Sequence, residues 1–141
     1  MWRSRGGRPR TDFGRGFYTT TLLRQAQTWA FQTVQTDPGG AAAVVAVEVD
    51  RNELAALEVL SFVRGDFDAE DFWSLVVHCR SGNPDHARAN GGWYDVVAGP
   101  VASFWRQRLT ISGVDQMSFH TAAAERVINT GRRWIEWTRH P

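Results

Sequence analysis

The longest uninterrupted apolar stretch of this sequence, residues 41–47, has the length of a β-strand. A membrane-spanning helix requires roughly 18 apolar residues in succession, so the sequence predicts no such helix. The stretch continues into the pattern AVVAVEVD at residues 43–50, which is apolar at almost every position. Because a strand that is covered on both faces has this composition, we expect residues 43–50 to form a central strand of a sheet.

Two amphipathic helices are predicted by apolar residues at spacings of three and four. The first covers residues 22–36 and ends at Asp37-Pro38-Gly39-Gly40, because Pro and Gly together break a helix. Its apolar positions are Leu22, Ala26, Trp29, Ala30 and Val34. The second covers residues 69–80, with Phe72, Trp73, Val76 and Val77 facing inward.

The remaining elements are short. Strands are expected at residues 17–20, 59–63, 93–98, 109–111, 116–120 and 134–137, a helical or irregular step at 51–57, a polar surface loop at 81–92 and a helix at 122–129. Short strands interrupted by a few helices are typical of an α+β fold with a split or curved sheet.

A chain of 141 residues, of which 43% are hydrophobic, is long enough for one compact domain. We expect a single domain over residues 1–141, with an Arg- and Gly-rich arm at 1–16. Cys79 is the only cysteine, and no apolar stretch of the kind found in secretion signals follows the N-terminal arginines; both features favour the cytoplasm. The four histidines lie on different predicted elements without metal-binding spacing, so no metal site is predicted.

The segment GRPRTDFGRGFYTTT contains the pattern with the most chemical content. Gly14 and Gly16 allow the backbone to approach a ligand closely, and successive amides in such a loop can bind an anion. Arg10 and Arg15 can add charge for a phosphate, and Tyr18 offers an aromatic face with a hydroxyl group. These features together suit a dinucleotide. The alternative is a tight turn before an edge strand, with Tyr18 packed on the core.

Four ordered blocks resemble the DUF3990 family, which is grouped with the ADP-ribosyltransferase-like folds. The blocks are DFGRGFYTTT with the following Gln25-Ala26 and Trp29-Ala30, the helix from Phe72-Trp73 to Arg80, the strand and turn YDVVAGPVA, and the strand QMSFHT entering a helix. The similarity runs from about Gly7 to Ile128. It implies an ADP-ribosyltransferase-like fold, with split mixed or antiparallel sheets flanked by short helices.

Enzymes of this superfamily bind NAD in a cleft between two small sheets and break the bond between nicotinamide and ribose. By resemblance, Tyr18 is expected to stack on the nicotinamide, and Gln116 lies where many relatives have a catalytic Glu. The predicted cofactor-binding residues are Arg10, Gly14, Arg15, Gly16, Phe17, Tyr18 and Thr19. Gln116 cannot act as a general base, and its alternative role is a strand amide bonded to neighbouring backbone. The interpretation requires a cleft between Tyr18 and Gln116.

The resemblance implies an NAD-dependent mono-ADP-ribosyltransferase, or an NAD glycohydrolase, with an unknown intracellular macromolecular acceptor. Small domains of this kind are often bacterial toxins of toxin–antitoxin pairs, which implies an antitoxin protein as partner. The alternative is a catalytically impaired module that binds NAD or ADP-ribose without turnover. Gln116 favours it, as does the start at Met1, which leaves little room for the first strand of related domains. A third hypothesis is a nucleic-acid-binding domain that uses the Arg-rich arm. The net charge of only +1 argues against this hypothesis.

Overall fold

The computed structural model describes residues 11–36, 39–62 and 69–139. The largest sheet within them contains β1 (Phe17–Thr19), β3 (Val59–Ser61), β4 (Val96–Gly99) and β7 (Gln116–Phe119), in the order β1-β7-β4-β3. Strand β7 is antiparallel to both β1 and β4, whereas β3 is parallel to β4. The strand that follows the Gly-rich segment therefore lies beside the strand that begins at Gln116.

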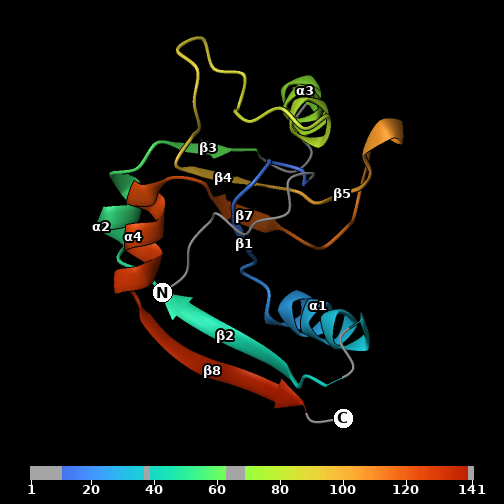
Figure 1. Cartoon of the computed structure of the whole chain (residues 1–141), viewed down its shortest axis with the longest axis vertical. Coiled ribbons are helices and arrows are strands. Elements are labelled where there is room, and N and C mark those ends of the chain that lie inside the picture. The colour runs from blue at the N-terminus through green and yellow to red at the C-terminus, as the bar shows by residue number, and fades with distance from the viewer. Residues whose placement is uncertain (1–10, 37–38, 63–68, 140–141) are drawn as a thin grey trace.

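A second sheet pairs β2 (Ala42–Glu48) with β8 (Arg132–Arg139) in antiparallel orientation. Within the described residues β2 pairs with β8 alone, so the prediction of a central strand is wrong. Its apolar composition has a different cause: α1 (Leu23–Thr36) packs along it (Figure 1), and Val47 contributes to a hydrophobic cluster under the larger sheet.

The four-stranded sheet lies between α3 (Ala69–Arg80) on one side and the β2–β8 sheet on the other (Figure 1). Adjacent residues of β4 show this, because Val97 packs in the cluster under α3 and Val96 packs in the cluster on the opposite face. The second cluster also contains residues of α4 (Ala122–Thr130), which contacts α2 (Arg51–Ala55). Both faces of β4 are thus covered.

The inward face of α3 is largely as predicted, since Phe72, Trp73 and Val76 are buried. Val77 is exposed, contrary to the prediction, because Leu75 and Cys79 complete the buried stripe of this helix. Helices of about the predicted bounds form at α1, α2 and α4, and α3 has the predicted bounds. None of the described helices is long and apolar enough to cross a membrane.

The strand predicted at residues 93–98 and the segment after it differ from the structure. β4 begins at Val96 instead of Trp93, because Trp93 and Tyr94 pack against the His86 ring, with ring centroids 4.7 and 5.8 Å from it. His86 is buried although it lies in the predicted surface loop. An unpredicted strand, β5 (Ala102–Phe104), pairs through a 3-10 turn with β6 (Leu109–Thr110) in a small third sheet. The fold class is α+β, as predicted.

Candidate functional site

The Gly-rich segment is folded back onto the four-stranded sheet by the hydroxyl group of Tyr18. This hydroxyl accepts a hydrogen bond from the Phe13 backbone N–H (3.0 Å), donates to the Gly14 carbonyl (2.6 Å) and lies 2.8 Å from the Thr11 hydroxyl. Burial raises the pKa of Tyr18 far above its ordinary value. The hydroxyl is therefore a neutral group that fixes the loop.

Asp12 joins this loop to three other elements. Its carboxylate is almost fully buried; Oδ1 accepts from Nε of Arg80 (2.9 Å), and Oδ2 accepts from the Ala102 N–H (2.8 Å) and from Nε2 of Gln116 (2.7 Å). Arg80 also forms an ion pair with this carboxylate. A buried carboxylate requires such partners to remain charged. The Asp12 carboxylate thus connects the loop with the end of α3, with β5 and with β7.

The amide of Gln116 has both of its N–H groups engaged. Nε2 donates to Asp12 and to the Pro100 carbonyl (2.9 Å), and the residue is 5% exposed. An amide has two N–H donors, so the orientation of Gln116 is fixed by these two acceptors. Asp12 thereby sets which atom of Gln116 points away from the network, namely Oε1.

Gly14 and Gly16 allow close packing within the chain. Gly14 has a φ of +83°, and a Cβ placed there would lie 2.8 Å from the Trp93 ring. A Cβ on Gly16 would lie 2.6 Å from Nδ1 of His120 and 2.7 Å from the Phe119 carbonyl oxygen. The absence of a side chain is therefore needed at both positions for the loop to lie on the sheet.

His120 lies below this loop as a buried, neutral imidazole. Its Nδ1 donates to the Arg15 carbonyl (2.9 Å), its Nε2 lies 2.7 Å from the Ser118 hydroxyl, and its ring stacks on Trp93. Burial lowers the pKa of His120 to about 4, with the neighbouring His86 ring acting in the same direction. The imidazole therefore serves the packing of the loop as a neutral hydrogen-bonding group.

We expect this burial to make folding stability depend on pH. The pKa of this histidine is about 4 in the folded protein and near 6.5 in the unfolded chain, so the unfolded chain binds a proton first as the pH falls. The free energy of unfolding is therefore highest above pH 6.5 and decreases as the pH falls toward 4. Between pH 7 and pH 5 the loss from His120 is about 2 kcal/mol. Urea unfolding at the two pH values measures it, and NMR should show a neutral His120 at pH 5. Equal stability at both values would contradict the burial of this ring.

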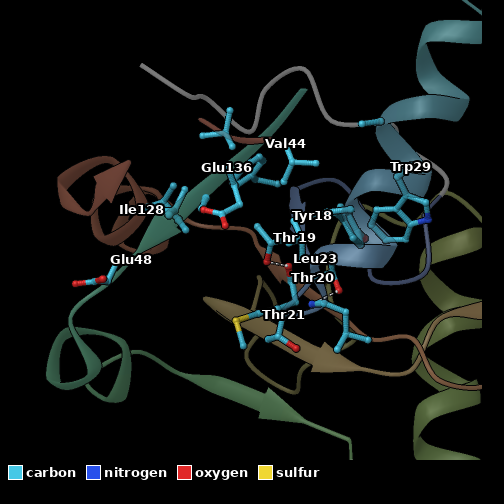
Figure 2. A pocket seen from close by; sticks show the side chains of 18 of the residues that line it. Tyr18, Thr19, Thr20, Thr21, Leu23, Trp29, Val44, Glu48, Ile128 and Glu136 are labelled. Atoms are coloured by element: carbon cyan, nitrogen blue, oxygen red, sulfur yellow. Dashed lines mark hydrogen bonds between the residues drawn. The ribbon is translucent and has the colours of Figure 1, made fainter. Parts of the chain in front are cut away.

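A cavity near these residues lies between the two larger sheets, with a volume of about 810 Å³ (Figure 2). Its size is within the range of small-molecule and cofactor sites. The wall includes residues of β1, the start and inner face of α1, strands β2 and β8, and β7; among them are Phe17, Tyr18, Thr19, Thr20, Thr21, Leu23, Trp29, Ala30, Glu48, Met117, Trp134 and Glu136. The cavity is largely apolar, with hydroxyl groups on the β1 side.

The predicted inward face of the first helix forms part of this wall. Leu22 and Leu23 are exposed and Trp29 is half-buried, whereas Gln25 is the buried residue of α1. Nε2 of Gln25 donates to the Asp115 carbonyl (2.6 Å), which ties α1 to the residue before β7. The apolar face of α1 thus borders a hollow, and the hydrogen bond from Gln25 holds the start of the helix beside β7.

The predicted site residues are divided by the fold. Phe17, Tyr18 and Thr19 line the cavity, Arg15 is exposed, and Arg10 lies outside the described residues. Gly14, Gly16 and Gln116 do not line it. Gln116 contacts the Gly-rich loop through its hydrogen bond to Asp12, and the next residue of that loop, Phe13, donates its N–H to the Tyr18 hydroxyl. The required cleft therefore borders Tyr18 without reaching Gln116.

Sequence reasoning missed three residues of this region. Asp12 and Arg80 both lie in recognised blocks, but 68 positions separate them and no local pattern joins them. Glu136 lies on the last strand, outside the four blocks. Among the described residues there is no group of three or more His, Cys, Asp or Glu side chains that could hold a metal ion.

Comparison with protein families gives a match over most of the chain. The model of the family described as "Protein of unknown function (DUF3990)" matches residues 3–110. This range contains the Gly-rich segment, α3 and the YDVVAGPVA block, and it ends before Gln116. No curated protein and no solved structure matches the chain. Since the match covers more than half of its length, the chain belongs to the DUF3990 family.

Proposed function

We propose that this protein is an NAD-dependent mono-ADP-ribosyltransferase with an ADP-ribosyltransferase-like fold, and that it binds NAD in the cavity between its two larger sheets. The observation that carries the proposal is the position of this cavity, because its wall continues from the Gly-rich segment through Phe17, Tyr18 and Thr19. The hydroxyls of Thr19, Thr20 and Thr21 on this wall donate within the chain, so toward a ligand they can act as acceptors from ribose hydroxyls. Aromatic rings of the wall can contact the flat bases. The resemblance to ADP-ribosyltransferase-like proteins supports the same ligand.

In the proposed reaction the bond between ribose C1′ and the nicotinamide nitrogen breaks, and the bonding electrons leave with nicotinamide. An acceptor nucleophile then bonds to C1′ and releases its proton to solvent. The acceptor is an intracellular macromolecule if the protein acts as a toxin, and water if it is an NAD glycohydrolase. A toxin of this kind would have an antitoxin protein as its partner.

A second candidate function is NAD or ADP-ribose binding without turnover. The specific observation in its favour is the state of Gln116, which is neutral and has both amide N–H groups engaged by Asp12 and Pro100. A Gln held in this way cannot accept a proton from an acceptor nucleophile.

Two measurements on the purified chain separate these functions. Calorimetry should show NAD binding, and chromatography should show released nicotinamide when a bacterial extract supplies the acceptor. Binding without release supports the second candidate, and the absence of binding contradicts both.

A matched pair of variants tests the location of the site. Ala30→Trp adds a large ring at the wall of the cavity and should abolish NAD binding, because the ring fills the space that the ligand needs. Gln32→Trp adds the same ring to an exposed position of the same helix that does not line the cavity, and it should leave binding unchanged. Equal affinities of the two variants would place the site elsewhere.

A further inference from the structure

The β8 wall of the cavity carries a carboxylate at an irregular point of the strand. Val44 pairs with Trp137 and Val45 pairs with Ile135, so Glu136 is the extra residue of a β-bulge. A bulge changes the direction of the side chain it carries and is frequent next to binding sites. Glu136 is one of the residues that line the cavity, and Figure 2 shows its side chain between those of Ile128 and Val44.

This carboxylate is oriented but not neutralised. Trp134 donates its indole N–H to Oε2 of Glu136, and within the part of the chain that the structure describes neither Glu136 nor Glu48, a second carboxylate of the lining, forms an ion pair. None of the described residues that line the cavity is an Arg. Among the described residues, the wall therefore carries two carboxylates and no basic side chain.

An aromatic face is available in the same cavity. Trp29 is half-buried in the wall, and its ring has no aromatic or cationic partner among the described residues. The ring of Trp134 differs, since the Arg132 guanidinium lies 5.3 Å from its centroid. An unpartnered Trp face together with an uncompensated carboxylate is an arrangement that attracts flat or quaternary cations.

We infer that the cavity binds a flat aromatic cation, with Glu136 as the residue that selects for positive charge and Trp29 as the aromatic surface. The inference rests on the proposed function in one respect: the pyridinium ring of NAD is a cation of this class. It adds a charge-selecting residue on β8, away from the Gly-rich segment.

The probes for this inference are 1-methylnicotinamide, a flat cation, and nicotinamide, which has nearly the same shape and is neutral at pH 7. Ligand-observed NMR titration gives the two affinities. We expect the intact protein to prefer the cation by roughly tenfold, about 1.4 kcal/mol, because of the charge of the Glu136 carboxylate. Glu136→Gln keeps the size and the hydrogen-bonding ability of the side chain, and it should remove the preference.

The control is Glu53→Gln, which removes an exposed carboxylate of α2 that does not line the cavity and should retain the preference. Thermal unfolding verifies that both variants fold. Equal affinities for the two probes, binding of neither, or a preference that survives Glu136→Gln overturns the inference. If the preference is present and lost as expected while NAD is neither bound nor cleaved, the inference stands and the proposed function fails.

Discussion

Replacing Asp12 with Ala should destabilise the protein by about 3 kcal/mol, the lower end of the range for breaking a buried ion pair. The substitution removes the common acceptor of Arg80, Ala102 and Gln116. The Arg80 side chain is 27% exposed, so water compensates part of its loss, whereas the Ala102 N–H and the Gln116 amide are left without this acceptor in the interior. Because small domains have a total stability of about 5–15 kcal/mol, the loss is a large fraction of it.

Urea unfolding measures this effect, and an exposed ion pair provides the control. Arg108 and Glu70 form a two-point contact on the surface, with side chains 51% and 70% exposed. Exposed pairs contribute little to stability, so Glu70→Gln should unfold at nearly the same urea concentration as the unchanged protein. If Asp12→Ala behaves like Glu70→Gln, the buried network does not hold the loop.

Gly16→Ala is the second substitution with a large expected effect, a destabilisation of about 1–3 kcal/mol from overpacking. The added Cβ meets the Phe119 carbonyl oxygen, a backbone atom of β7, as well as the His120 ring. Since the contact with backbone cannot be relieved by a side-chain rotation, β1 must move away from β7. The hydrogen bond from His120 to the Arg15 carbonyl should weaken, and NMR should report a change in the His120 imidazole.

Gly39→Ala is the matched control, because no atom lies within 4 Å of a Cβ placed at Gly39. We expect its unfolding midpoint in urea to equal that of the unchanged protein. An equally small effect of Gly16→Ala would mean that β1 does not lie against His120, and the contacts of the Gly-rich segment would need revision.

Local sequence patterns determined most of the secondary structure. The bounds of α3 and the positions of α1, β1, β6 and β7 follow from spacings within a few residues, because helix and strand periods are properties of neighbouring side chains. The same reasoning is wrong for β2, because its apolar composition predicts a central strand, whereas β2 pairs with β8 alone among the described residues. Apolar composition does not specify which elements cover a strand, and Val45 of β2 is 57% exposed.

The sequence by itself also identified the Gly-rich segment and the family to which the chain belongs. Only the tertiary structure decided what those residues contact. Asp12 meets Gln116 across 104 positions, and Glu136 enters the cavity because the pairing of β2 with β8 shifts by one residue. Such contacts depend on strand register and on how sheets pack, which are long-range properties of the whole chain. Local patterns therefore determined most helices and strands. Packing between distant segments placed Tyr18 in the wall of the cavity and Gln116 in the buried network around Asp12.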